Sequence, residues 1–344
     1  MNQPSMNQLD INNSTNTNSD REQVTLFAQQ KQKLIKELHK KVVGQDQVIK
    51  QLLLTILSGS HALFVGVPGL AKTLLIATLS ETLKLNFNRI QFTPDLMPSD
   101  MTGAEILEED PNNHQRHFRF MRGPVFTNIL LADEINRTPP KTQAALLQAM
   151  QEKKVSVASH TYPIQAPFHV FATQNPIEQE GTYPLPEAQL DRFMFMVDVG
   201  YPSFEEEMQI VSYTPQTQTP IDPILGPEEL LALQTLTMRI PVAKPLLEWA
   251  VRLVRATRKT ELQAPDIVKQ YVDFGAGPRA TQHLILAAQA SALFNGRFAV
   301  DIDDLKEQAL FVLPHRLVLN YKGIAEKIKP QAIIEQLFRS VGTC

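Results

Sequence analysis

The residues of this sequence best suited to chemistry are Lys72 and Thr73, which open a leucine-rich segment. They follow an apolar run and a loop with two glycines and a proline. The loop and its flanking residue are Gly66, Val67, Pro68, Gly69, Leu70, Ala71 and Leu74. A strand that breaks into such a loop and continues as a helix directs backbone N–H groups and the positive helix end at an anion. Lys72 would reach the β- and γ-phosphates of a nucleotide, and the Thr73 hydroxyl would bind Mg²⁺.

Ala71 departs from the usual phosphate-loop pattern, which has glycine directly before the lysine. We expect Ala71 to begin the helix with an ordinary negative φ, where alanine costs nothing and favours the helix. On that expectation the loop keeps its function. The other interpretation of this segment, taken alone, is a strand, turn and helix without a ligand.

A site that hydrolyses a nucleotide needs more than a phosphate loop. It needs a further carboxylate near the Mg²⁺, a base that orients the attacking water, and charge that stabilises the transition state. The apolar run Asn128–Glu134 ends in two acids. Asp133 would hold Mg²⁺ through a water, beside the phosphate loop if the two strands are neighbours, and Glu134 would polarise the attacking water. The alternative is a solvated pair of acids after a strand.

Asn175 ends another apolar run, Val170–Asn175. From the strand between the two catalytic strands, its amide would contact the γ-phosphate or position the attacking water. Because Asn-Pro is a strong turn signal by itself, the alternative for Asn175 is a turn residue before Pro176.

Two arginines are candidates for charge stabilisation. Arg192 lies near the end of a short predicted helix, and Arg279 follows the helix-entry sequence Gly-Ala-Gly-Pro. An arginine at a subunit boundary can reach the γ-phosphate bound by a neighbour, which is worth roughly 10³–10⁵ in rate. A surface pair of Asp191 with Arg192 is the alternative. Arg279 would let a helical domain sense the γ-phosphate and close on it.

The elements that must position these residues alternate along the chain. Short apolar runs predict strands at Ala62–Val65, Asn88–Phe92, Asn128–Ala132, Val170–Thr173 and Phe193–Val199. Strands that alternate with helices favour a parallel, three-layer α/β sheet. Two inserts between core elements alternate as β-hairpins, at about 104–122 with a turn at 110–113, and at about 153–165.

Changes in composition divide the chain into four parts. Residues 1–22 are polar and almost free of large apolar side chains, which predicts a disordered tail. The α/β core is expected over 23–214, and a linker rich in proline and threonine over 215–227. A mostly helical domain is expected over 228–344.

Length and composition limit the possible functions. With 344 residues, 43% of them apolar, the chain is long enough for two or three domains. A formal net charge of -3 gives no global attraction to nucleic acid or to an anionic membrane. The single cysteine, Cys344, excludes an intrachain disulfide. No apolar run approaches the roughly 18 residues of a membrane span, and the polar N-terminus resembles no secretory signal. We therefore expect a soluble cytoplasmic protein.

Five short motifs together resemble those of the MoxR family of AAA+ ATPases. In chain order they are GVPGLAKT, LLADEINR, ATQNP, LPEAQLDRF and GAGPRA, and the resemblance covers nearly all of the chain from about Val24. It implies an α/β fold in which an AAA+ P-loop core, a three-layer parallel sheet, is followed by a small all-helical lid. It also implies a ring, usually a hexamer, that binds ATP and Mg²⁺ and hydrolyses ATP at subunit interfaces. MoxR proteins carry alanine at the position of Ala71.

The resemblance also assigns roles to individual residues. The matches are Lys72 and Thr73 to Walker A, Asp133 and Glu134 to Walker B, Asn175 to sensor 1, Arg192 to the arginine finger that acts on a neighbour, and Arg279 to sensor 2. The turn Val43-Gly44-Gln45 resembles the segment that lines the adenine pocket. The insert at 104–122 resembles the helix-2 insert of this clade, and that at 153–165 its pre-sensor-1 hairpin. In related motors these inserts point toward the ring pore or contact the client.

The resemblance implies a chaperone-like remodeller that matures or activates other protein complexes. Such proteins often act with a partner that carries a von Willebrand A domain, which we expect to be a separate protein here. The alternatives are a motor on nucleic acid, the motor subunit of a metal chelatase, and a nucleotide-gated scaffold that hardly hydrolyses. Basic and aromatic residues interleave in the first insert, as at Arg119 and Phe120, and would suit nucleic acid. The acidic residues of the same insert argue against it, and Glu134 with Arg192 argues against the scaffold.

Overall fold

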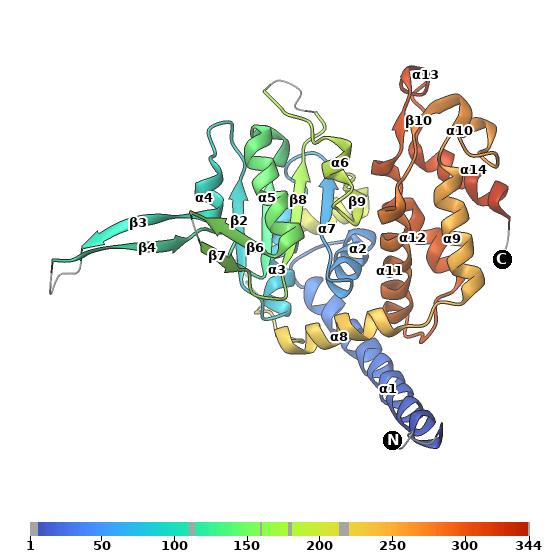
Figure 1. Ribbon diagram of the computed structural model, residues 1–344, viewed down its shortest axis with the longest axis horizontal. Coiled ribbons are helices and arrows are strands. Elements are labelled where there is room, and N and C mark those ends of the chain that lie inside the picture. Colours follow the sequence, from blue (N-terminus) through green and yellow to red (C-terminus); the bar gives the residue numbers. More distant parts are fainter. Residues whose placement is uncertain (1–5, 110–113, 159, 178–180, 213–219, 343–344) are drawn as a thin grey trace, which may run out of the picture.

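The computed structural model describes residues 6–109, 114–158, 160–177, 181–212 and 220–342. Five parallel strands form one sheet in the order β2-β5-β8-β1-β9 (Figure 1). They are β1 (Ala62–Val65), β2 (Phe87–Gln91), β5 (Ile129–Asp133), β8 (His169–Gln174) and β9 (Phe195–Asp198). Each strand lies within two residues of its predicted range, so the parallel α/β core is confirmed.

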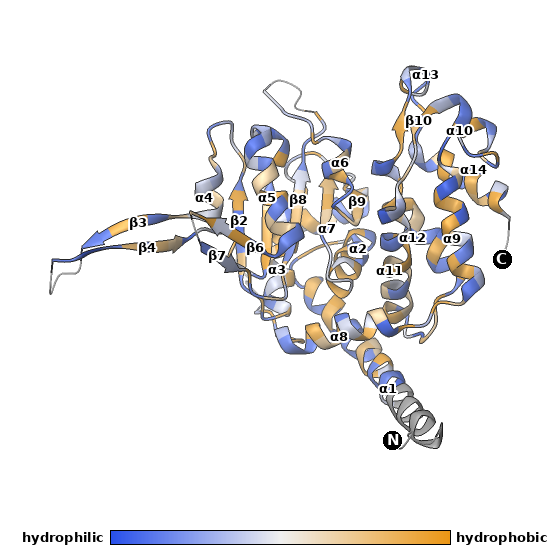
Figure 2. Ribbon diagram, viewed as in Figure 1, coloured by the Kyte–Doolittle hydropathy of each residue, from blue (hydrophilic) through white to orange (hydrophobic). Residues whose placement is uncertain are grey.

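The central strands are apolar because both faces of the sheet are covered (Figure 2). Successive residues of a strand point to opposite faces, so Leu131 of β5 packs in one hydrophobic core and Leu130 in another. The first core includes residues of α2 (Asp46–Leu57) and α3 (Lys72–Thr82), and the second includes residues of α5 (Pro140–Glu152). Helices, sheet and helices thus form the three predicted layers.

Shorter helices complete the core. They are α4 (Pro98–Thr102), the 3₁₀ turn η1 (Ile135–Arg137), α6 (Glu187–Leu190) and α7 (Phe204–Ser212). The predicted linker lies partly outside the described residues. Its described part, 220–226, forms no helix or strand and is attached to the core where Ile224 N donates to Thr82 O at 2.8 Å.

Two antiparallel hairpins leave the core at the predicted inserts. β3 (Gly103–Glu109) pairs with β4 (Arg116–Arg122), and β6 (Lys154–Val157) pairs with β7 (His160–Pro163). The first hairpin extends far beyond the body of the molecule (Figure 1). Its predicted turn at 110–113 lies outside the described residues. The prediction that each insert contains two paired antiparallel strands is confirmed.

The base of the longer hairpin is fixed by close contacts. Gly103 has a φ of 93°, and a Cβ atom there would lie 2.1 Å from Met121 O, so only glycine fits. The Phe120 ring stacks on Tyr162 of the shorter hairpin, with 4.0 Å between ring centroids. The inner ends of the two hairpins therefore support each other, while the outer part of the first projects from the core.

A helical domain follows the sheet. Its helices are α8 (Pro227–Arg239), α9 (Lys244–Ala256), α10 (Asp266–Tyr271), α11 (Pro278–Phe294), α12 (Ile302–Val312), η2 (Pro314–Arg316), α13 (Tyr321–Ala325) and α14 (Pro330–Val341). The expectation of an all-helical lid is wrong in one respect, because β10 (Val272–Phe274) pairs with β11 (Val318–Leu319). Strands of three and two residues are too short to leave an alternating pattern in the sequence.

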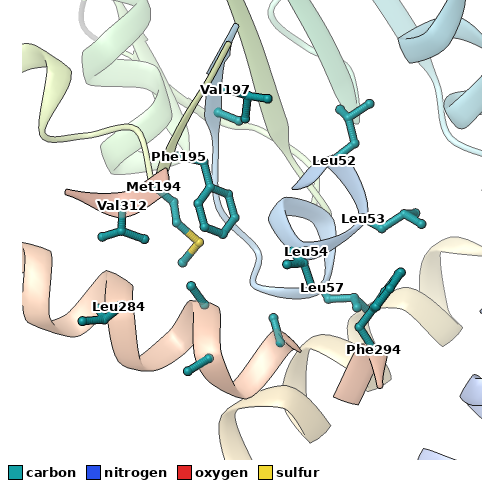
Figure 3. Close-up of a cluster of buried hydrophobic side chains, with 14 of the residues drawn as sticks. Leu52, Leu53, Leu54, Leu57, Met194, Phe195, Val197, Leu284, Phe294 and Val312 are labelled. Carbon is teal, nitrogen blue, oxygen red and sulfur yellow. The ribbon is translucent and has the colours of Figure 1, made fainter. Parts of the chain in front are cut away.

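The helical domain packs on the β9 side of the sheet (Figure 3). Phe195 of β9, Leu57 of α2, Leu284 of α11 and Val312 of α12 belong to one buried cluster. Core and lid therefore share a hydrophobic interior.

The N-terminal helix α1 spans Met6–Leu38, so most of the tail expected to be disordered is helical. No glycine or proline interrupts the chain between Ser5 and Val43, so nothing in the sequence stops the helix from extending into the polar segment. Asp20 is also buried, 2.7 Å from the guanidinium of Arg239. No helix in the described part of the chain is both long and apolar enough to cross a membrane.

Candidate nucleotide-binding site

The carboxyl ends of the parallel strands meet at one edge of the sheet, where ligands of open α/β folds bind. A cavity of about 410 Å³ lies there. It is lined by Gly66, Pro68, Gly69, Leu70, Ala71, Lys72, Thr73, Leu74, Arg89, Gln91, Asp133, Glu134, Thr173 and Asn175. The structure therefore brings the predicted loop, both acids and the amide around one cavity.

Ala71 differs from its prediction. Its φ of 53° and ψ of 18° are left-handed, so the expected negative φ is wrong. Ala71 precedes the first turn of α3 and accepts a hydrogen bond from Leu75 N at 2.9 Å. This conformation costs residues other than glycine roughly 1–2 kcal/mol. Alanine is therefore strained at a position where the usual glycine would not be.

Lys72 lies inside the phosphate loop. Its Nζ donates to Gly66 O at 2.7 Å, and it forms no ion pair among the described residues. Burial lowers the pKa of Lys72, and the nearby carboxylates of Asp133 and Glu134 oppose that shift. The lysine charge is thus held by the loop and available to an anion in the cavity.

Asp133 lines the cavity although its strand, β5, does not pair with β1. β8 lies between β1 and β5, so these two strands are not neighbours, and Asn175 follows the strand between them as predicted. Thr173 Oγ1 donates to Asp133 Oδ1 at 2.6 Å and accepts from Glu134 N at 2.8 Å. One hydroxyl on β8 therefore positions both acids. Sequence reasoning missed Thr173, because its role depends on the strand order.

The two acids also have partners on other elements. Arg89 Nη2 lies 2.6 Å from Asp133 Oδ2, Gln91 Nε2 donates to Glu134 Oε2 at 3.1 Å, and Arg137 Nη1 lies 3.1 Å from Glu134 Oε2. These three residues were not predicted either. For two of them the sequence offered one signal: Arg89 and Gln91 are two residues apart, which puts both side chains on one face of β2. Gln91 lies opposite Asp133 in the sheet.

Glu134 and Asn175 have constrained surroundings. Glu134 has a φ of 59°, a left-handed conformation of the kind that clusters at active sites. Asn175 Oδ1 accepts from Ile177 N at 3.1 Å, and Asn175 also lines the cavity. The turn interpretation of Asn175 is therefore correct, and the same residue remains next to the candidate nucleotide.

The turn Val43-Gly44-Gln45 contacts the phosphate loop, but it does not line the cavity. Gln45 Nε2 donates to Leu70 O at 3.1 Å. Val67 of the loop is also outside the lining and packs against the first hydrophobic core. These residues support the loop from the protein side.

Arg192 and Arg279 do not line this cavity. Both line a smaller one of about 160 Å³, together with His61 and His283. His61 directly precedes β1 and Gly66 directly follows it, so the two arginines lie toward the opposite edge of the sheet. Arg279 is therefore not placed to sense a γ-phosphate in the cavity of its own chain.

The residues around the large cavity suit a nucleotide with Mg²⁺. Thr73 offers a hydroxyl and Asp133 a carboxylate, which are oxygen donors of the kind Mg²⁺ takes alongside waters and substrate phosphates. Among the described residues, no group of three or more His, Cys, Asp or Glu is arranged to hold a metal ion. A metal at this site would thus depend on phosphate oxygens for part of its coordination.

Two family profiles match the chain. The one described as "ATPase family associated with various cellular activities (AAA)" matches residues 61–195, and the AAA lid domain matches residues 264–337. A solved structure of a protein from Cytophaga hutchinsonii, assigned as an ATPase, superposes with a TM-score of 0.87 at 41% identity. It covers 95% of this chain and 98% of that one.

Two curated relatives match most of the chain. The chain is 46% identical over 310 residues to Chaperone MoxR1 of Mycobacterium tuberculosis, which covers 90% of this chain and 81% of that protein. It is 40% identical over 311 residues to the uncharacterized protein YeaC of Bacillus subtilis, covering 90% and 93%, respectively. The chain belongs to the MoxR family of AAA+ ATPases.

Proposed function

We propose that this chain hydrolyses ATP with Mg²⁺ as a subunit of a cytoplasmic ring, usually a hexamer in this family, and uses the energy to remodel partner proteins. The observation that carries the proposal is the convergence of Lys72, Thr73, Asp133 and Glu134 on one cavity. These residues come from two separate segments of the sequence. Together they supply a phosphate-binding cation, oxygen donors for a metal, and a base.

Each residue has one task in the proposed reaction. Bound Mg²⁺ supplies charge stabilisation at the phosphate oxygens, with Thr73 and Asp133 as its protein donors. Lys72 offsets the charge of the β- and γ-phosphates. Glu134 orients the attacking water and accepts its proton, and the amide of Asn175 holds the water or the γ-phosphate in place.

The site is incomplete within one chain, because both candidate arginines lie toward the opposite edge of the sheet. We propose that a neighbouring subunit supplies Arg192 to the γ-phosphate. Arg279 lines the same small cavity as Arg192, so we place it at that subunit boundary as well. Hydrolysis then depends on ring assembly.

A protein client fits the projecting hairpin better than nucleic acid does. Arg119 lies 3.3 Å from Glu108, so an acid of β3 offsets a basic residue of β4. Leu107 and Phe118 are cross-strand partners, 54% and 70% exposed, and offer an apolar surface. The chaperone name of the Mycobacterium tuberculosis relative supports the same proposal. We extend it to maturation or activation of partner complexes, together with a separate von Willebrand A domain protein.

Glu134→Gln tests the proposed reaction. Glutamine keeps the shape of the side chain but cannot accept a proton, so turnover should fall by about 10²–10⁴ while Mg·ATP still binds. Phosphate release and calorimetric titration measure the two effects. Glu261→Gln, which removes an acid paired with Arg255 in the lid, is the control and should retain the parental rate. Parental turnover in Glu134→Gln would show that the assigned base is wrong.

The same variant tests the client. A subunit that holds ATP without hydrolysing it should retain its protein client, which can be captured and identified against Glu134→Gln combined with Lys72→Ala. A salt-titrated DNA-binding assay examines the alternative. Tight DNA binding by the hairpin, lost on raising the salt concentration, would favour a motor on nucleic acid instead.

A further inference from the structure

A buried arginine of the lid, outside the nucleotide cavity, forms several hydrogen bonds with the core. The side chain of Arg316 in η2 is 2% exposed. Its Nε donates to Asp191 Oδ1 at 2.7 Å and its Nη2 to Asp191 O at 3.1 Å and Phe193 O at 2.7 Å. Its Nη1 donates to Met194 O at 3.2 Å and to Val312 O within the lid. All three guanidinium nitrogens are therefore engaged.

The partners of Arg316 in the core flank Arg192 on both sides. Backbone carbonyls of residues 191, 193 and 194 are all held, and His315 Nε2 also lies 3.1 Å from Phe193 O. The guanidinium of Arg192 itself has no hydrogen bond or ion pair in the part of the chain that the structure describes. The backbone that carries Arg192 is thus fixed to the lid, while its side chain is available to another molecule.

The chemistry of this contact is specific to arginine. Arg279 Nη1 lies 3.5 Å from the second oxygen of Asp191, so that acid is shared by two lid arginines. His283 Nδ1 lies 2.7 Å from Arg316 Nη2 and must accept, which requires a neutral imidazole. Burial lowers the pKa of His283 to about 3, so this state holds through the neutral range. A lysine has no planar fork and cannot reach this set of acceptors at once.

We propose that Arg316 is a positioning residue for Arg192, which ties the segment that carries the proposed finger to the lid of the same subunit. The position of one lid thereby sets the position of a guanidinium at the next subunit's nucleotide. The inference rests on the proposed function, in which Arg192 serves a neighbour. It adds a route by which the state of one subunit affects hydrolysis in the next.

Arg316→Met and Arg316→Lys test the inference in the assembled protein. A misplaced catalytic group costs about 10²-fold in rate, so kcat should fall by that order in the methionine variant. The KM for ATP should stay within about twofold, because the cavity of the same chain lies at the other edge of the sheet. Arg297→Met is the matched control. It removes a lid arginine that lies 2.5 Å from buried Asp304 and forms no hydrogen bond or ion pair with the described residues 191–194, so kcat should not change.

Mixed rings separate positioning from general damage. A subunit with Arg316→Met has an intact nucleotide cavity and a displaced Arg192. A subunit with Glu134→Gln has an inactive nucleotide cavity and a correctly placed Arg192. Rings mixed from the two should exceed the summed activity of the separate variants severalfold, as should rings mixed from Arg192→Ala and Glu134→Gln. If Arg316→Met does not assemble, as judged by sedimentation, Arg316→Lys takes its place.

The outcomes are distinct. A gain on mixing with Arg192→Ala but none with either Arg316 variant would overturn the positioning role and leave the shared site intact. No gain with Arg192→Ala either would overturn the shared site itself. A change in KM with unchanged kcat would also contradict the inference, because it would place the effect of Arg316 in the nucleotide cavity of its own chain.

Discussion

Because Ala71 has a positive φ, the effect of Ala71→Gly on the free energy of unfolding tests the geometry of the phosphate loop. At a positive φ, Ala71→Gly should raise the free energy of unfolding by up to about 1 kcal/mol, because relief of roughly 1–2 kcal/mol of strain exceeds the extra unfolded-state entropy of glycine. At a negative φ the same change would lower stability by about 0.5–1 kcal/mol. Denaturant unfolding measures the sign. Ala77→Gly, in the middle of α3, is the control and should destabilise by about 1 kcal/mol.

Residue types in motifs could be predicted, and residues that depend on strand register could not. Lys72, Thr73, Asp133, Glu134 and Asn175 follow short local patterns, and all of them line the cavity. Thr173, Arg89 and Gln91 come to the acids only because β8 and β2 flank β5. Neither the strand order nor the register is contained in a local pattern, so these partners were missed.

At the scale of the elements, neutral histidines are buried at the amino-terminal edge of the sheet. His169, at the start of β8, is buried, with Nδ1 2.9 Å from Ser60 O and Nε2 3.2 Å from Gln234 Nε2. Gln234 Nε2 also donates to Ile56 O at 2.8 Å, which fixes the amide orientation. His169 Nε2 must therefore accept, and a second proton there would face another donor. Burial lowers the pKa of His169 to about 4.

This arrangement predicts acid destabilisation. The folded-state pKa lies below the unfolded value of about 6.5, so the unfolded chain binds more protons between these values. The stabilisation is complete above about pH 6.5 and is lost as the pH falls toward 4, with a slope of up to about 1.4 kcal/mol per pH unit for each histidine. Urea unfolding at several pH values, followed by the fluorescence of Trp249, should show a shallower slope in His169→Gln. His117→Gln in the exposed hairpin is the control, and equal slopes in His169→Gln and the parent protein would contradict the prediction.

Long elements with a clear apolar pattern could be predicted from the sequence. Short elements, and an element made of polar residues, could not. The five strands follow apolar runs and lie within two residues of their predicted ranges, and α9, α11, α12 and α14 lie in the segment predicted to be mostly helical. β10 and β11 are too short to show a period. α1 extends into a polar segment that composition assigned to disorder, and Asp20, a buried residue of that extension, pairs with Arg239 of α8. Such a contact is made between residues 219 positions apart, which local composition cannot anticipate.

For the whole molecule, the placement of the lid decides where the arginines act. Sequence reasoning identified Arg192 and Arg279 by their motifs but placed the lid over the nucleotide of the same subunit. In the structure, hydrophobic packing of α11 against α2 and of α12 against β9 holds the lid on the β9 side of the sheet. The two arginines therefore line a cavity toward the amino edge. The side of the sheet on which the lid packs depends on how whole apolar surfaces fit together. A short sequence motif does not specify that side.

This placement predicts that ATPase activity depends on concentration. Since the phosphate loop and the arginines lie toward opposite edges of one subunit, an isolated subunit lacks the charge that is worth roughly 10³–10⁵ in rate. Specific activity should fall steeply as the protein is diluted through the concentration at which sedimentation shows the ring dissociating. Arg192→Ala, already deprived of that charge, should have a low activity that dilution barely changes. A parental activity that stayed constant across dissociation would mean that each subunit completes its own site, and that the arginines toward the far edge have another role.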